Sequence, residues 1–226
     1  MRKRMLILFF IFLILIILLF QNNSVTASKT VDPSQPVIAL TFDDGPSKYT
    51  DEIVEYLHKE DVVATFFIVG NKVPLYKKTL KKAIQYGNEI GNHSYSHKWL
   101  SRLNKKEMKE EISKANKIIQ KELNYTTKLL RPTYGGINQR LRENTNLKIV
   151  FWTVDTRDWK YKNITSIVNE AKKAKDGDII LMHDLHERTL KSLKDIIPLL
   201  KDYNFEFVTI SQLEEIKLIR DKISEK

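Results

Sequence analysis

Two short segments hold the side chains best suited to chemistry. In the first, TFDDGPS (residues 41–47), an apolar strand-like run ends in two adjacent carboxylates, Asp43 and Asp44, and a Gly-Pro pair follows. Neighbouring side chains on a strand point to opposite faces, so both aspartates can serve one site only if the backbone turns there. Gly45 and Pro46 permit that turn. The alternative is a solvated turn, because Asp and Gly are common turn residues.

The second segment is HSYSH, which begins at His93 and ends at His97. One helical turn after a strand would place both imidazoles on one face, at a separation that a metal ion can bridge. This segment lacks the glutamate of HExxH, so a base and a third ligand must come from elsewhere. Asp43 and Asp44 can supply both, because binding one of them to a cation relieves their mutual repulsion. The two segments together predict a divalent-metal site.

Alternating strand and helix patterns must position these side chains. Apolar strand-like runs occupy residues 37–42, 64–69, 89–93, 128–132, 149–155, 178–183 and 206–210. Amphipathic helical patterns lie between them, near residues 50–60, 74–86, 104–122, 163–175, 189–201 and 211–222. Residues 133–147 read as a loop with a short helix. This order predicts an α/β fold with a parallel sheet, either open and doubly wound or closed into a barrel.

Polar side chains follow the predicted strands at their carboxyl ends. Asp43 ends the first and His93 the third, Arg131 ends the fourth in RPTYGG, Asp155 ends the fifth in DTRDW, and His183 ends the sixth in LMHD. In both architectures the functional site lies at the carboxyl ends of the strands. We therefore expect these side chains to meet at one edge of the sheet.

Several helix ends carry local signals. Asn104 with Glu107, and Ser211 with Glu214, have the spacing of capping boxes. Gly87 suits the position just after the second helix, where a left-handed backbone is common. These signals predict helix boundaries close to the ends of the apolar patterns.

The N-terminus indicates export. MRKR precedes sixteen uncharged apolar residues, 5–20, and a small-residue site ends at Ala27. This pattern predicts a signal peptide over residues 1–27, or an uncleaved membrane anchor, and an extracytoplasmic domain in both cases. Residues 28–36 form a polar linker, and we assign residues 37–226 to one domain.

Composition excludes several kinds of site. The chain has 226 residues and no cysteine, which rules out disulfides, thiolate metal sites and a cysteine nucleophile. The formal net charge is +10, but the lysines are scattered along helical patterns, as on solvated faces. We predict no nucleic-acid partner.

TFDDGPS, HSYSH, RPTYG, DTRDW and LMHD, in this order and spacing, resemble the five motifs of the polysaccharide deacetylase family, also called the NodB-homology or carbohydrate esterase family 4 domain. The resemblance covers about residues 36–215, and its first two motifs are the most specific. It implies a distorted (β/α)7 barrel of the TIM-barrel type. One departure is Thr133, where the family usually has a second proline.

The resemblance also implies a role for each matched residue. Asp44, His93 and His97 would bind a divalent metal, commonly zinc, with cobalt or another divalent ion as alternatives. Asp43 would be the general base, and Arg131 would hold it ionised and oriented. Which aspartate binds the metal is taken from the family.

The implied reaction is hydrolysis of an N-acetyl group on an amino sugar. Asp43 would take a proton from the attacking water, and His183, kept charged by Asp158, would protonate the departing amine. The backbone N–H of Tyr134 would help the metal to stabilise the oxyanion. Trp159 and Leu181 would form a small apolar pocket for the acetyl methyl group.

Other functions fit the residues less well. A glycosidase needs carboxylates on both sides of the scissile bond, about 5 Å or more apart, and Asp43 and Asp44 are adjacent. A catalytically silent wall-binding module would be expected to lose a ligand or the base, and here the set is complete. Peptidoglycan is the expected substrate, and chitin oligomers or an O-acetyl ester are the alternatives. The sequence does not separate N-acetylglucosamine from N-acetylmuramic acid.

Overall fold

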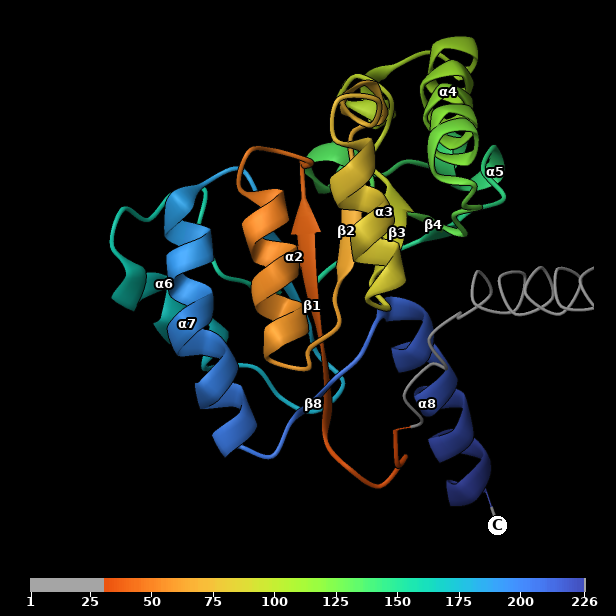
Figure 1. Cartoon of the computed structure of the whole chain (residues 1–226). Helices are drawn as coiled ribbons and strands as arrows, with labels where there is room; N and C mark the ends of the chain where they lie inside the picture. Colours follow the sequence, from red (N-terminus) through yellow and green to blue (C-terminus); the bar gives the residue numbers. More distant parts are fainter. Residues whose placement is uncertain (1–30, 226) are drawn as a thin grey trace, which may run out of the picture. The chain divides into compact units, whose positions relative to one another are not determined.

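The computed structural model describes residues 31–225, in which strands and helices alternate along the chain (Figure 1). The strands are β1 (Val37–Asp43), β2 (Thr65–Ile68), β3 (Glu89–Asn92), β4 (Leu129–Leu130), β5 (Lys148–Ile149), β6 (Val154–Asp155), β7 (Ile179–His183) and β8 (Glu206–Phe207). The α-helices are α2 (Thr50–Lys59), α3 (Lys77–Gln85), α4 (Lys105–Leu123), α5 (Gln139–Glu143), α6 (Ile164–Ala171), α7 (Glu187–Asp202) and α8 (Ile210–Ser224). Three short 3₁₀-helices are η1 (Gly70–Lys72), η2 (Leu100–Arg102) and η3 (Thr133–Gly135).

The predicted signal peptide or membrane anchor, residues 1–27, lies outside the described residues, as does the first part of the predicted linker. Within residues 31–225, no helix combines the length and the apolar character needed to cross a membrane. The assignment of residues 37–226 to one catalytic domain stays a prediction.

All pairs of neighbouring strands run parallel, in the order β5-β4-β3-β2-β1-β7-β6, and β8 pairs with the first part of β1. Parallel neighbours require crossover connections, and the helices between the strands supply them. The outer strands β5 and β6 follow one another in the chain and are joined by residues 150–153. This arrangement confirms the predicted α/β fold, a distorted (β/α)7 barrel.

The prediction of one strand over residues 149–155 is wrong, because β5 and β6 lie on opposite edges of the sheet. The backbone between them accepts hydrogen bonds from the buried guanidinium of Arg131. The carbonyl of Val150 accepts a hydrogen bond from Arg131 Nε at 3.4 Å, and that of Phe151 accepts one from Arg131 Nη2 at 3.1 Å. A buried guanidinium needs such acceptors, so these two carbonyls bind Arg131 instead of a neighbouring strand.

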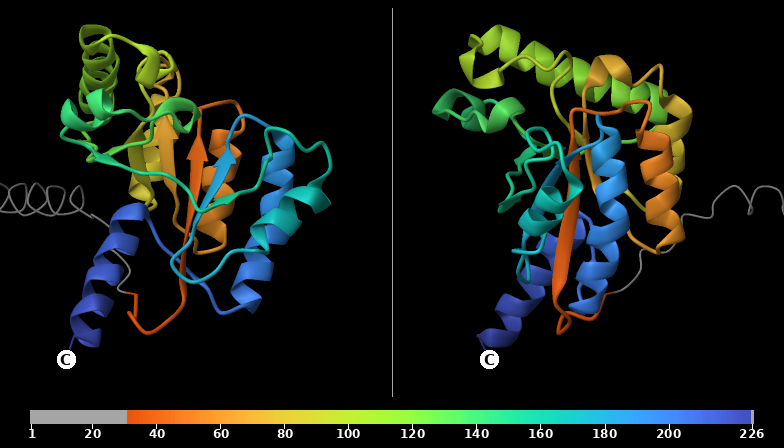
Figure 2. Two further views of the ribbon diagram at one scale, coloured as in Figure 1. Left: turned by 180° about the vertical axis from the view of Figure 1, so that it is seen from behind. Right: turned by 90° about the vertical axis from the view of Figure 1, so that its left-hand side faces the viewer.

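The central strand β1 divides its side chains between two cores. Ile38, Leu40 and Phe42 pack in the larger core with residues of α2, α6 and α7. Figure 1 shows α2 and α7 in front of the sheet, and the side view in Figure 2 places both on one face. Val37 and Ala39 join residues of α8 in a second core on the other face. Since side chains alternate along a strand, Thr41 and Asp43 also lie on this second face.

Most local signals agree with the structure. Asn104 and Glu107 form the capping box that opens α4, and Gly87 has φ +85° directly after the last turn of α3. The connection after β4 contains the short helix α5, as predicted.

The capping box predicted at Ser211 is wrong. The N-cap of α8 lies two residues earlier, at Thr209, which forms the box with Gln212. Ser211 lies inside the first turn, where its N–H donates to Glu89 Oε2 at 3.0 Å. Both spacings satisfy the sequence rule, and a contact to a distant strand decides between them.

Candidate active site

The two adjacent aspartates reach the same edge of the sheet because the chain turns at Asp44. Asp43 is the last residue of β1 and is 4% exposed. Asp44 has φ +69°, a left-handed conformation that redirects its side chain, and a cis bond joins Gly45 to Pro46. A Cβ at Gly45 would lie 2.1 Å from both carboxylate oxygens of Asp184, so only glycine fits. The expected turn is present, and it begins at the second aspartate.

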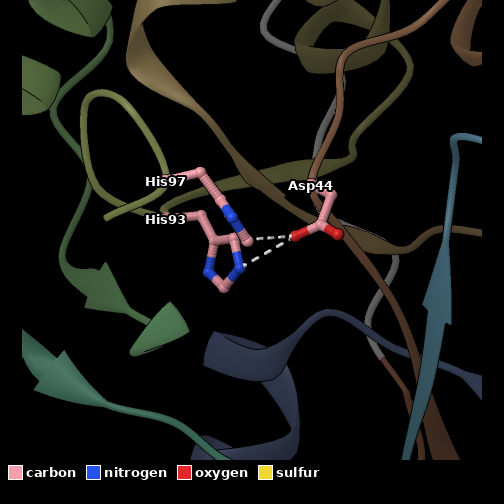
Figure 3. A group of neighbouring side chains, drawn as sticks. All are labelled: Asp44, His93 and His97. Atoms are coloured by element: carbon pink, nitrogen blue, oxygen red, sulfur yellow. Dashed lines mark ion pairs between the residues drawn. The ribbon is translucent and has the colours of Figure 1, made fainter. Parts of the chain in front are cut away.

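Asp44, His93 and His97 bring one carboxylate oxygen and two imidazole nitrogens together (Figure 3). The distance from Asp44 Oδ1 to His93 Nε2 is 3.2 Å, and that to His97 Nε2 is 2.7 Å. The ligand atoms lie within 4.8 Å of one another. Burial raises the pKa of Asp44, but hydrogen bonds and positive charge from the two histidines outweigh it and hold this pKa far below its usual value. Two histidines and one carboxylate form a donor set suited to a divalent transition metal.

The loop that carries the two histidines is not the helical turn that we expected. Ser94 and His97 both have positive φ, +65° and +61°, so the loop bends back on itself. Helix α4 holds this shape. The buried carboxylate of Glu111 accepts hydrogen bonds from the N–H groups of Tyr95 at 3.1 Å and Ser96 at 2.8 Å, and from the Ser96 hydroxyl at 2.8 Å. The separation of the two imidazoles therefore depends on a tertiary contact.

His93 is fixed in the tautomer that a metal ligand needs. Its Nδ1 lies 2.7 Å from the carbonyl oxygen of Arg131, which can only accept, so Nδ1 donates. In the neutral imidazole this leaves the lone pair on Nε2, the nitrogen beside Asp44, where a metal ion could bind it. Such a hydrogen bond on the far nitrogen commonly orients metal-binding histidines.

Arg131 is fully buried and reaches Asp43 from the end of β4, which is separated from β1 by β3 and β2 in the sheet. Its Nη1 donates to Asp43 Oδ1 at 2.8 Å and to Thr41 Oγ1 at 2.7 Å. The guanidinium carbon lies 4.1 Å from the centre of the Phe67 ring. Asp43 Oδ2 remains 3.9 Å from His93 Nε2, at the edge of the candidate metal site. The arrangement holds one carboxylate oxygen and directs the other toward the site.

His183 ends β7 in register with Asp43 on β1, so the two side chains are neighbours on the same face. Its Nδ1 lies 2.7 Å from Oδ1 of the fully buried Asp158, whose Oδ2 accepts from the His183 N–H at 2.7 Å and from Thr189 Oγ1 at 2.6 Å. Burial lowers the pKa of His183, but the hydrogen bond and charge of Asp158 outweigh it and raise this pKa to about 9. His183 is therefore protonated at neutral pH.

The three residues predicted to contact substrate lie around this edge. Tyr134, in η3, has φ +59° and is 60% exposed, and its ring meets His97 edge-on at 4.9 Å. Leu181 precedes His183 by two residues on β7 and so shares its face. Trp159 is 55% exposed and donates from Nε1 to Asp155 Oδ2 at 3.5 Å. Asp155 also caps the following turn, because its Oδ1 accepts from Arg157 N–H.

Sequence reasoning missed three residues that hold the site. Glu111 supports the histidine loop, Lys72 Nζ donates to the Asp44 carbonyl at 2.7 Å, and Asp184 lies under the aspartate turn with a hydrogen bond from Thr50. Asp184 follows His183 in LMHD, a signal that was available. Glu111 and Lys72 carry no such signal, because helical lysines and glutamates are normally solvated.

Comparison with known proteins identifies the family of the chain. A family model described as polysaccharide deacetylase matches residues 30–150. The peptidoglycan-N-acetylmuramic acid deacetylase PdaC of Bacillus subtilis is 44% identical over 200 residues, covering 88% of this chain and 43% of that protein. A solved PdaC structure has a TM-score of 0.83 and covers 86% of this chain and 97% of the solved one at 43% identity.

Two further relatives extend the comparison. The peptidoglycan-N-acetylglucosamine deacetylase PgdA of Listeria monocytogenes is 38% identical, covering 80% of this chain and 39% of that protein. A family 4 acetyl xylan esterase of Clostridium thermocellum, solved with a cobalt ion, has 32% identity and a TM-score of 0.76, covering 80% of this chain and 91% of the solved one. The chain spans less than half the length of PdaC and PgdA.

The fold and the site define an α/β domain with a candidate metal-binding triad beside a buried carboxylate and an aspartate-paired histidine. This chain belongs to the polysaccharide deacetylase family.

Proposed function

We propose that this protein is a metal-dependent hydrolase that removes N-acetyl groups from the amino sugars of peptidoglycan. One observation carries the proposal. Asp43 and His183, register neighbours on β1 and β7, stand beside the converging ligand atoms of Asp44, His93 and His97. A carboxylate held by an arginine and a protonated histidine are the two proton-transfer groups that amide hydrolysis requires.

Asp44, His93 and His97 would hold the metal, and we propose zinc. Bound there, the ion would polarise the acetamide carbonyl and lower the pKa of water. The donor set supports this assignment, as does the tautomer of His93. The cobalt ion solved with the related esterase is consistent with a site that accepts more than one divalent ion.

The protein side chains would move the protons. Asp43, oriented by Arg131, takes a proton from the water that adds to the carbonyl carbon. The carbon–nitrogen bond then breaks, and His183 gives its proton to the departing amine. Asp158 keeps His183 charged until that step. Acetate and a free amino sugar are the products.

The remaining contacts would place the acetyl group. Leu181 and Trp159 provide apolar surface for the methyl group, and the backbone N–H of Tyr134 would donate to the oxyanion. The exposed rings of Tyr134 and Trp159 leave room for sugars along this edge of the sheet.

The names of PdaC and PgdA support peptidoglycan as the glycan. PdaC is named for the N-acetylmuramic acid of peptidoglycan and PgdA for its N-acetylglucosamine. Chitin oligomers are the alternative amide substrate. An acetyl xylan esterase among the structural relatives supports a second candidate, hydrolysis of O-acetyl esters, since an ester carbonyl would suit the same groups. A peptidoglycan substrate also agrees with an extracytoplasmic location, either secreted or anchored by residues 1–27.

Acetate release tests the proposal. The purified full-length protein is offered peptidoglycan, chitin oligomers and acetylated xylan, first as prepared, then with a chelator, then with zinc restored. We expect release from peptidoglycan that the chelator abolishes and zinc restores. Asp43→Asn should lose activity, whereas Asp202→Asn, the same change at the exposed end of α7, should not. Release that resists the chelator, or that survives Asp43→Asn, would overturn the mechanism.

A further inference from the structure

A continuous row of side chains in ring contact leads away from the candidate metal site to an arginine. The ring of His97 meets that of Tyr134 at 4.9 Å, and Tyr134 packs against Trp99 with ring centres 4.9 Å apart at 39°. The guanidinium carbon of Arg102 lies 3.4 Å from the centre of the Trp99 ring. Three contacts therefore connect Arg102 to a predicted metal ligand.

The two loops that build this row are locked together. The Thr133 hydroxyl donates to the Lys98 carbonyl at 2.6 Å and accepts from the Leu100 N–H at 3.3 Å. A Cβ at Gly136 would lie 2.3 Å from Trp99 Nε1, so the indole packs directly on the backbone. Thr133 stands where the resemblance leads us to expect proline, and proline has no hydroxyl for these bonds. The position of Trp99 relative to Tyr134 is set by this link.

The charge of Arg102 is not neutralised within residues 31–225. The side chain is exposed, and no carboxylate of this part of the chain lies within ion-pair distance of it. Stacking uses the face of the guanidinium and leaves its N–H edge available. That edge matches a carboxylate, which accepts two parallel hydrogen bonds from arginine. The indole has already restricted the side chain, so less entropy is lost on binding.

We propose that Arg102 is a specificity residue that binds a carboxylate carried by the glycan, while the exposed ring of Tyr134 contacts the sugar between Arg102 and the metal site. This inference rests on the proposed function. Peptidoglycan offers two sources of the carboxylate. Muramyl sugars freed of peptide carry a lactyl carboxylate, and muramyl sugars with a stem peptide carry carboxylates on the peptide instead.

The test compares kcat and KM for acetate release in the full-length protein and two variants. Arg102→Gln removes the stacked charge. Arg142→Gln removes an exposed arginine of α5 that stacks on no ring within the described part of the chain, and it serves as the matched control. The substrates are peptide-free muramyl glycan, the same glycan with stem peptides, and uncharged chitotetraose.

We expect Arg102→Gln to lower the ratio of kcat/KM for a muramyl glycan to that for chitotetraose about tenfold, mainly through KM, because one charge-assisted contact is lost. Arg142→Gln should keep the wild-type ratio, and Arg102→Lys should recover part of it. A loss confined to peptide-free glycan identifies the lactyl carboxylate as the ligand, and a loss confined to the other glycan identifies the stem peptide. If chitotetraose is not hydrolysed, the two glutamine variants are compared on muramyl glycan alone.

An unchanged ratio in Arg102→Gln, or an equal loss in both glutamine variants, would overturn this inference while the deacetylase function stands. No acetate from any glycan with the wild-type protein would instead overturn the proposed function and this inference with it.

Discussion

Replacing Asp158 by asparagine should move the alkaline limit of activity to lower pH. Asp158 is fully buried, and its charge and hydrogen bond raise the pKa of His183 to about 9, against the burial of the imidazole. Asparagine keeps the size of the side chain but removes the charge. Burial is then opposed only by the charges of Asp43 and Asp44, so the pKa of His183 should fall well below 9, toward its ordinary value of 6.5.

The magnitude follows from the protonated fraction of His183. At pH 8 a group of pKa about 9 is about 90% protonated, and one of pKa about 6.5 is about 3% protonated. The variant should therefore lose about thirtyfold in rate at pH 8 from this cause alone. At pH 6, His183 is almost fully protonated in the wild type and about three quarters protonated in the variant. The loss of rate from deprotonation therefore almost disappears at this pH.

The assay is kcat/KM for acetate release between pH 5.5 and 10, because this quantity reports the groups of the free enzyme. Thr189→Val is the control, since it removes one hydrogen bond to Asp158 but leaves the carboxylate charge. Its alkaline limit should stay near that of the wild type. Circular dichroism verifies folding at each pH. An alkaline limit in Asp158→Asn that coincides with the wild type would refute the assignment of His183 as the acid.

Three further changes test the supports of the site. Glu111→Gln should weaken zinc binding about tenfold in competition with a chromogenic chelator, because the histidine loop loses the carboxylate charge and one of its two acceptor oxygens. Glu110→Gln, on the exposed side of α4, should not weaken it, and equal affinities of the two variants would contradict this role. Gly45→Ala should lower the free energy of unfolding by about 1–3 kcal/mol in urea, because its Cβ would overlap Asp184, and an unchanged midpoint would count against the close contact. Burial raises the pKa of Asp184 to about 7, so between about pH 4 and 7 the folded protein binds more protons than the unfolded chain and stability falls as pH rises. Asp184→Asn should flatten that part of the stability profile, and a slope equal to the wild type would show that another group causes it.

The amino-acid sequence was enough to predict the α/β class and most of the side chains that gather at the candidate site. Alternating apolar runs and amphipathic helices indicated a parallel α/β sheet, because these patterns repeat with the periods of strand and helix. The rule that function gathers at the carboxyl ends of parallel strands then placed Asp43, His93, Arg131 and His183 together, and the structure agrees. The motif resemblance added the roles, which remain predictions.

How these residues face one another follows from contacts that exist only in the folded chain. The positive φ values of Asp44 and His97, the division of residues 149–155 into two edge strands, and the support of the histidine loop by Glu111 depend on contacts between segments far apart in the chain. The stacking of Arg102 on Trp99 depends on η2 in the same way. A sequence pattern shows the hydrophobic periodicity and the helix-capping residues of a single segment. It does not record which distant side chain will satisfy a buried polar group, and that requirement is what shaped each of these features.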